Sequence, residues 1–307
     1  MKKGVALWLI IALVVVIPTQ ASAREASQKG IQKFLDALEE RCREYGWTDI
    51  KPQEIPWEYY RTTQRKAPLL FAQFGSPKND CVLFLGDVHG DELTTVCVLL
   101  KFAHYIKEHP TIYQDTCIII APLVNPDGFF SKPPQRVNAN GVDINRNFPT
   151  RDWHADAVRL WQKKTRGSRR YYPGKKPGSE QETLFQMALI KRFKPQKILS
   201  VHSPLGFYDF DGPSADLDSF EQWLEKISKE TNFPLKRNGY FPGSLGNYAG
   251  HERKIFTLTL ELASSEPSRG NAFFQQFQTA IVKFINLRLM NSQNLRLSLS
   301  DGKESAR

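Results

Sequence analysis

Four nearly unbroken apolar runs recur along the chain, alternating with stretches in which apolar residues repeat at helical spacing. Successive side chains of a strand point to opposite faces, so a strand that is apolar throughout needs cover on both sides. Strands of this kind interleaved with helices indicate an α/β fold with a sheet covered on both faces. The expected strands are residues 81–85, 117–123, 197–201 and 255–262, and the expected helices are residues 92–107, 180–193, 218–231 and 273–290.

The chain is expected to hold one catalytic domain. Its 307 residues and 41% hydrophobic content suffice for a single large core, and no internal repeat or clear linker interrupts the pattern. A helix over residues 31–45 and a strand over residues 69–74 would precede the first long strand. The predicted division is a signal peptide at residues 1–23, the catalytic domain at residues 24–292 and a polar C-terminal tail at residues 293–307.

The first 23 residues have the three parts of a secretory signal. Lys2 and Lys3 form a basic start, residues 5–17 are apolar, and Ala21-Ser22-Ala23 is a small-residue cleavage site. The apolar run is shorter than the roughly 18 to 20 residues that cross a bilayer. We therefore expect export with cleavage after Ala23, and no transmembrane segment in the mature chain.

The balance of charge indicates which partners are plausible. Lys2 and Lys3 are the only charged residues in the expected signal, so its removal lowers the formal net charge from +10 to +8. In an exported protein, this charge favours an anionic surface such as the cell wall. No recognition motif accompanies the charge, so nucleic acid is not an expected partner.

Four cysteines leave two interpretations open. They are Cys42, Cys81, Cys97 and Cys117, and their spacing matches neither a small disulfide scaffold nor a CxxC metal site. Cys81 and Cys117 each open an apolar run, so a disulfide between two neighbouring strands is conceivable. The alternative is that all four are buried free thiols.

A histidine and a glutamate stand just after the first long strand, in the segment GDVHGDE. His89 and Glu92 are three residues apart across a glycine, where a turn lets an imidazole and a carboxylate converge. His202 follows another strand, in the segment SVHSP. Ligands of an α/β sheet gather beyond the carboxyl ends of its strands, and two histidines with one carboxylate are a common catalytic zinc set. These three residues are the predicted ligands of one Zn²⁺ ion.

A fourth polar residue lies near the end of the last long strand, in TLEL. Glu261 is flanked by Leu260 and Leu262, and burying an unpaired carboxylate is costly. A general base beside a metal-activated water would explain its position. The structural alternative is an internal ion pair with Arg136 or Arg146.

The segment RVNANGVDINRNFP lies between these residues and has no apolar periodicity. Its Arg136 and Arg146 stand among four asparagines, which is typical of a structured loop that binds anions. The alternatives are that Arg136 is a surface cation and that Arg146 anchors loop carbonyls.

Together these motifs resemble the M14 family of zinc carboxypeptidases. Each motif is weak alone, but their common order over roughly residues 69–290 is specific. The matching pieces are HxxE at His89 and Glu92, NPDGF at residues 125–129, NGVDINRNFP with Asn145 and Arg146, YYPGKKPGSEQET at residues 171–183, SVHS with His202, and TLEL with Glu261.

The resemblance implies a three-layer α/β/α sandwich with a central mixed β-sheet, and a role for each matching residue. Glu261 would activate a water at the zinc and return the proton to the leaving amine. Arg136 would polarise the scissile carbonyl and stabilise the oxyanion. Asn145 and Arg146 would clamp the free carboxylate of the released residue. The family's mobile tyrosine would be Tyr240, although Tyr248 also flanks the segment PGSLG.

Within the family, the chain is most similar to the murein peptide amidases and murein DL-carboxypeptidases of bacterial cell walls. That branch implies hydrolysis of the amide bond between γ-D-glutamate and meso-diaminopimelate. Because wall peptides are the expected substrate, we expect the protein in the periplasm rather than in the extracellular space. The segment GSLGNYAG offers no acid for a pocket floor, which argues against a preference for Lys or Arg. Asn247 or Arg253 would then contact the second carboxylate and amine of diaminopimelate.

Three other functions remain open. The first is a metallocarboxypeptidase that releases C-terminal L-amino acids from ordinary peptides. The second is a catalytically inactive wall-binding protein, which the presence of every ligand and Glu261 disfavours. The third is the aspartoacylase-like branch of the fold, to which NPDGF and NGVDINRNFP are less suited.

Overall fold

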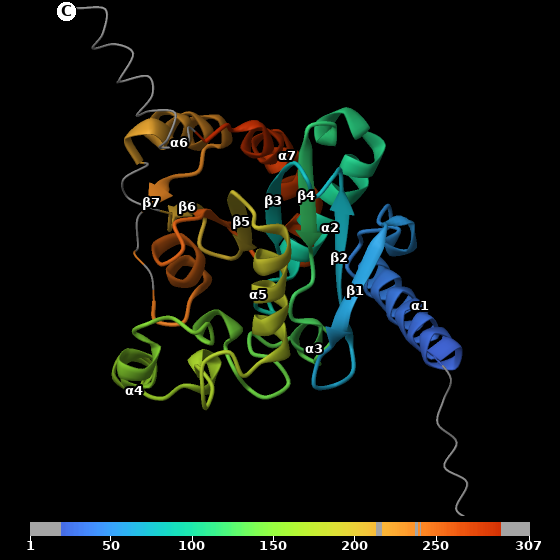
Figure 1. The fold of residues 1–307 in the computed structure, drawn as a ribbon, viewed down its shortest axis with the longest axis horizontal. Coiled ribbons are helices and arrows are strands. Elements are labelled where there is room, and N and C mark those ends of the chain that lie inside the picture. Colours follow the sequence, from blue (N-terminus) through green and yellow to red (C-terminus); the bar gives the residue numbers. More distant parts are fainter. Residues whose placement is uncertain (1–19, 213–216, 237–238, 240, 290–307) are drawn as a thin grey trace, which may run out of the picture.

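One eight-stranded mixed sheet runs through the protein (Figure 1). The computed structural model describes residues 20–289 except 213–216, 237–238 and 240. The strand order is β1-β2-β4-β3-β5-β8-β6-β7. The strands are β1 (Trp57–Thr62), β2 (Pro68–Phe74), β3 (Asp80–Leu85), β4 (Thr116–Ala121), β5 (Lys197–His202), β6 (Phe207–Phe210), β7 (Leu235–Lys236) and β8 (Phe256–Glu261).

The centre of the sheet is parallel and its flanks are mixed. Strands β4, β3, β5 and β8 pair in parallel, whereas β2 joins β4, β1 joins β2, and β6 joins β8 in antiparallel fashion. Parallel strands point their carboxyl ends to the same edge of the sheet. The residues that follow β3, β5 and β8 are therefore brought to one edge, although they are far apart in sequence.

Helices cover both faces of the sheet, as the apolar strands predict. On one face, α1, α2, α6 and α7 pack on a core that includes Val82 and Phe84. On the other, α5 and several loops pack on a core that includes Leu83 and Leu85. The three-layer sandwich is confirmed. The helices are α1 (Gln20–Glu44), α2 (Leu93–Glu108), α3 (Pro126–Phe129), α4 (Val158–Thr165), α5 (Gln181–Phe193), α6 (Leu217–Thr231) and α7 (Gly270–Asn286).

The predicted elements exist, with shifted ends. The strand expected over residues 117–123 ends at Ala121, and the helix expected over residues 273–290 runs over residues 270–286. Helix α7 begins with Gly270, which lies so close to α2 that a Cβ at this position would overlap the side chain of Cys97. Strands β1, β6 and β7 were not predicted, since they lie toward the flanks and are short or only partly buried.

Most of the expected signal peptide, residues 1–19, and the expected tail at residues 293–307 lie outside the described residues. Among the residues described, none of the helices combines the length and apolar content needed to span a bilayer.

All four cysteines are buried and free. Cys81 and Cys117 are neighbours, as the disulfide interpretation requires, because they face each other in the register of β3 and β4. The structure nevertheless agrees with the interpretation as buried thiols.

Candidate active site

The turn after β3 carries His89 and Glu92 into a buried position. Asp87 adopts a positive φ of 49°, and its carbonyl accepts a hydrogen bond from the amide of Asn125 at 2.9 Å. Gly90 lies so close to the backbone of residues 128–129 that a Cβ would overlap it. The NPDGF segment, residues 125–129, thus holds the turn after β3 in place, and this fixes the side chains of His89 and Glu92.

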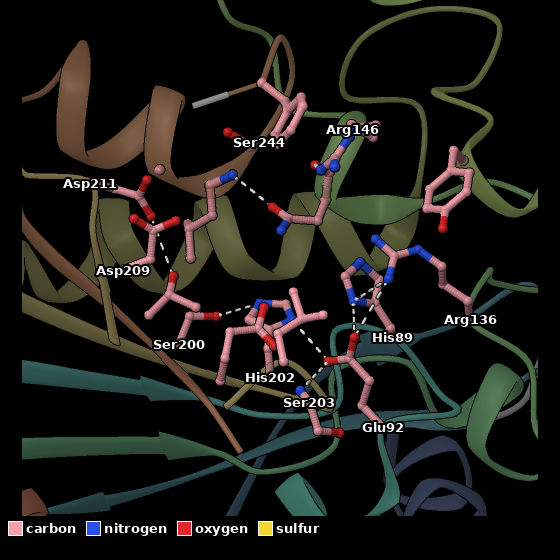
Figure 2. Close-up of a pocket in the computed structure, with 18 of the residues that line it drawn as sticks. His89, Glu92, Arg136, Arg146, Ser200, His202, Ser203, Asp209, Asp211 and Ser244 are labelled. Carbon is pink, nitrogen blue, oxygen red and sulfur yellow. Dashed lines mark hydrogen bonds and ion pairs between the residues drawn. The ribbon is translucent and has the colours of Figure 1, made fainter. Parts of the chain in front are cut away.

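His89, Glu92 and His202 converge at one point (Figure 2). Their ligand atoms all lie within 4.8 Å of one another. Nδ1 of His89 is 2.7 Å from Oε1 of Glu92, and Nδ1 of His202 is 2.9 Å from Oε2. Although burial acts to raise the pKa of Glu92, the two imidazoles hold it below its usual range, so the carboxylate is charged.

The outer nitrogens of both imidazoles are held by other residues. Nε2 of His89 lies 3.1 Å from Oδ1 of Asp143, and Nε2 of His202 lies 3.0 Å from Oγ of Ser200. Such outer partners fix the tautomer and leave the inner nitrogen to bind a metal. The donor set therefore fits zinc, which accepts imidazole nitrogen and carboxylate oxygen in catalytic sites.

Asp143 is a site residue that the sequence reasoning missed. Its Oδ2 accepts hydrogen bonds from Nε and Nη2 of Arg136, both at 3.0 Å. Burial opposes its ionisation, but Arg136 and His89 hold the pKa of Asp143 well below its usual range. Asp143 therefore orients one predicted ligand and one predicted catalytic arginine together. The sequence does contain a signal for Asp143, which is the one acidic residue in the segment NGVDINRNFP.

Glu261 ends β8 and faces the same cavity. Its Oε2 is buried and has no hydrogen-bond partner in the described part of the chain, and burial raises the pKa of the carboxyl group. The alternative of an internal ion pair is not realised in the described part of the chain, where Arg136 binds Asp143 and no ion pair joins Glu261 to Arg146. The position suits a group that exchanges a proton with a ligand.

Asn145 and Arg146 belong to a short 3₁₀ turn that also lines the cavity. Oδ1 of Asn145 accepts a hydrogen bond of 2.8 Å from the amide of Leu245, which joins this turn to the segment GSLGNYAG. The guanidinium of Arg146 lies 4.4 Å from the ring centroid of Phe241. Burial lowers the pKa of Arg146 and Asp143 opposes this shift, but a guanidinium is charged at neutral pH, so Arg146 offers a cation to an anionic group in the cavity that it lines.

The cavity that contains these residues has a volume of about 360 Å³. Its floor differs from the prediction, because Asp209 and Asp211 line it from β6 and the residue after it. Asn247 and Arg253 do not line it: Nδ2 of Asn247 binds Asp152, and Arg253 stacks on the ring of Tyr248 at 3.3 Å. The expectation that Asn247 or Arg253 would contact the side chain of diaminopimelate in this pocket was therefore wrong.

Arg170 and two tyrosines bear on the rim of the cavity. Arg170, at the end of the basic segment 163–170, lines the cavity and forms an ion pair of 2.5 Å with Asp91. Tyr240, the predicted covering tyrosine, lies outside the described residues, whereas Tyr248 is buried against Phe148.

Comparison with known proteins identifies relatives over most of the chain. The sequence profile of zinc carboxypeptidases (Peptidase_M14) matches residues 62–274. Murein peptide amidase A of Escherichia coli K12 is 31% identical over 229 residues, which cover 70% of this chain and 86% of that protein. Murein peptide amidase A of Vibrio campbellii is 31% identical over 204 residues, covering 64% of this chain and 75% of that protein.

Solved structures share the fold. A murein-tripeptide amidase from Escherichia coli O157 superposes with a TM-score of 0.55 at 24% identity, covering 77% of this chain and 95% of that one. Bovine thrombin-activatable fibrinolysis inhibitor, solved with tick carboxypeptidase inhibitor, gives a TM-score of 0.64 at 17% identity, covering 84% of this chain and 95% of that one. At these identities, the likeness concerns the fold.

Proposed function

The chain belongs to the zinc carboxypeptidase family and is a peptide-bond hydrolase, and on this premise we propose that it is an exported zinc enzyme acting on murein stem peptides. The bond cut is the amide between γ-D-glutamate and meso-diaminopimelate. The observation that carries this choice is the similarity to murein peptide amidase A over 229 residues. The formal net charge supports it, because the chain without residues 1–23 still carries 10 − 2 = +8 and a basic protein is attracted to an anionic wall.

His89, Glu92 and His202 would hold the metal, because their ligand atoms converge and their outer contacts orient them. A zinc ion in this position supplies Lewis acidity, which polarises a carbonyl and lowers the pKa of water. Asp143 and Ser200 keep the two imidazoles in the tautomer that binds it.

Glu261 is the residue that moves the proton. Its carboxylate takes a proton from the attacking water, whose oxygen forms a bond to the scissile carbonyl carbon. When the carbon–nitrogen bond breaks, Glu261 returns the proton to the leaving amine. The buried Oε2 at the cavity wall supports this assignment, because this oxygen has no hydrogen-bond partner among the described residues.

The remaining residues position the substrate. Arg136, held by Asp143, donates hydrogen bonds to the carbonyl oxygen as negative charge develops there. Asn145 and Arg146 bind the free carboxylate of the released residue, since both line the cavity. Tyr240 covers the bound substrate, by analogy with the family.

The test is a digest of purified muropeptides with tri-, tetra- and pentapeptide stems, analysed by mass spectrometry. The mature protein is used with zinc, with chelator and as Glu261→Gln. Loss of diaminopimelate from the tripeptide, absent with chelator or in the variant, is the expected result. Glu266→Gln is the matched control, because Glu266 is exposed on the loop after β8.

The other outcomes separate the competing functions. Cleavage of ordinary peptides at the C-terminus without any change in muropeptides would refute the proposed substrate and leave the mechanism standing. Zinc binding without turnover of either substrate would favour the inactive wall-binding protein.

The proposed location is the periplasm, where wall peptides are found. The basic start, apolar run and small-residue site of residues 1–23 support export. Cell fractionation of the full chain tests this, with the N-terminal sequence of the recovered protein expected to begin at Arg24.

A further inference from the structure

Nearly all of the excess positive charge of the chain lies in one segment, the basic excursion at residues 151–176. It contains nine lysines and arginines and two aspartates, which gives a formal net charge of +7. The chain without residues 1–23 carries +8, so the rest of it is close to neutral. All nine cations are exposed: Arg151, Arg159, Lys163, Lys164, Arg166, Arg169, Arg170, Lys175 and Lys176.

Two tryptophans fasten the basic excursion and leave its cations outside. Trp153 is buried, and its Nε1 donates a hydrogen bond of 2.8 Å to the carbonyl of Arg146. Nε1 of Trp161, on α4, donates a hydrogen bond of 2.6 Å to the carbonyl of Ser168 beyond the end of that helix. Figure 1 shows α4 at the periphery of the molecule. The backbone of the excursion is therefore held in place by the domain, with its charges facing solvent.

Most of these cations have no acidic partner in the described part of the chain. Arg159 forms an ion pair with Asp156, and Arg170 forms one with Asp91. No ion pair within the described ranges involves the other seven cations of the excursion. Their charge is therefore available to an anionic ligand.

The helix itself accounts for only part of this charge. The dipole of α4 favours cations in its last turn, where Lys163 and Lys164 lie. Arg169, Lys175 and Lys176 come after the helix and gain nothing from its dipole. Cations gathered in this way repel one another, and a ligand that carries several negative charges would relieve the repulsion.

The basic excursion also borders the active site. Arg170 and Tyr171 line the active-site cavity. A smaller cavity of about 180 Å³ lies between the excursion and the site, because Trp161 and Lys164 line it together with Arg146. A ligand that extends along the excursion is therefore held beside the proposed site of hydrolysis.

We propose that the basic excursion is a docking surface for polymeric murein, whose uncut stem peptides carry more free carboxylates than amines. The inference rests on the proposed hydrolysis of these stems in the neighbouring cavity. Stems repeat along a glycan strand, so one stem enters the cavity while its neighbours contact the cations, which raises the local concentration of substrate. The enzyme thus acts on stems that are still attached to strands, before the reactions that release free peptides.

The first test measures binding without turnover. The Glu261→Gln protein is sedimented with purified sacculi, alone and with Lys163→Gln, Arg166→Gln and Arg169→Gln added. The three substitutions are expected to raise Kd about tenfold, the scale of three exposed ion pairs. Added salt should also weaken binding, because it screens exposed charges. No binding, or binding that neither the substitutions nor salt change, would overturn the proposal.

The matched control removes three cations elsewhere on the surface. Lys78 lies in the loop between β2 and β3, and Lys226 and Lys229 lie on α6, where all three are exposed. Their replacement by glutamine changes the net charge equally, but Kd for sacculi should stay close to that of the parent. An equal loss in the control would show that net charge alone matters and would contradict a docking surface at the excursion.

The second test compares kcat/KM on sacculi with kcat/KM on the free tripeptide. With Glu261 intact, the substitutions at Lys163, Arg166 and Arg169 should lower the value on sacculi about tenfold. The value on the tripeptide should be unchanged, because the small substrate needs only the cavity. An equal loss on both substrates would indicate a structural effect and refute the inference.

The two tests separate this inference from the proposed function. Binding of sacculi through the excursion, with no muropeptide cut by the wild type, would support the docking surface and refute the proposed hydrolysis. Cleavage of free muropeptides, with binding of sacculi that ignores the excursion, would do the reverse. Tighter binding to duplex DNA or to vesicles containing phosphatidylglycerol, at the same ionic strength, would contradict murein as the partner.

Discussion

His202 and Glu261 lie directly opposite each other on the neighbouring parallel strands β5 and β8. One is a predicted metal ligand and the other the proposed proton carrier. Ser200, which holds the imidazole of His202, pairs with Thr259, which holds Asp211. A single register thus sets the spacing between the metal, the base and the pocket floor.

Glu261→Gln is expected to lower kcat by about 10² to 10⁴-fold, the range for loss of a general acid–base group. Zinc content should be unchanged, because Glu261 is not one of the three converging ligands. Turnover and metal analysis of the same sample check this. Loss of zinc together with activity would contradict the assigned role.

Asp143→Asn is expected to weaken zinc binding by about 10- to 100-fold. The amide cannot replace a carboxylate that contacts His89 and accepts two hydrogen bonds from Arg136. Competition with a chelator of known affinity measures the change. Unaltered zinc affinity would show that His89 is oriented by other contacts.

The stability of the fold should fall as pH rises through the titration of Glu182. Glu182 lies in the first turn of α5, and burial raises its pKa from 4.5 to about 7. Between these values the unfolded chain releases the proton while the folded chain keeps it. The contribution of roughly 3 kcal/mol is complete below pH 4.5 and lost above pH 7.

Urea unfolding of the wild type and Glu182→Gln at pH 5 and pH 8 measures this effect. The variant should lose less stability between the two pH values, because glutamine does not titrate. Other groups, including Asp211, titrate in both proteins and cancel in the comparison. The same pH dependence in both would place the titration elsewhere.

The four cysteines are expected to resist thiol reagents in the native protein. All four are buried, and burial raises the pKa of the Cys42 thiol to about 12, so little reactive thiolate forms. In denaturant without reductant, Ellman's reagent should count four thiols. A count of two would instead support the disulfide between Cys81 and Cys117.

The positions that sequence reasoning located share one property. His89, His202 and Glu261 follow or end apolar strands, where a polar residue is conspicuous against its surroundings. The edge at which parallel strands end then brings such residues together, whatever their separation. The convergence could be expected without knowledge of the strand order.

Asp209 and Asp211 lacked that contrast. They alternate with aromatic residues, Asp209 within the four-residue strand β6 near the edge of the sheet and Asp211 just after it, so they resemble solvent-facing acids. Only the pairing of β6 with β8 turns them toward the cavity. The prediction that Arg253 contacts the substrate was wrong for a related reason. Its guanidinium stacks on the ring of Tyr248, and this tertiary contact cannot be read from the sequence.

The order of the strands also has a kinetic consequence. Strand β3 ends at Leu85, and its neighbour β5 begins at Lys197, with β8 following only at Phe256. Closing such long loops costs entropy before any pairing between them is gained, which slows folding relative to helical bundles. During refolding, we expect the chain to bind zinc only after its helices have formed. A zinc-sensitive dye in solution measures the zinc uptake and circular dichroism measures helix formation, so metal binding reports the last stage of folding.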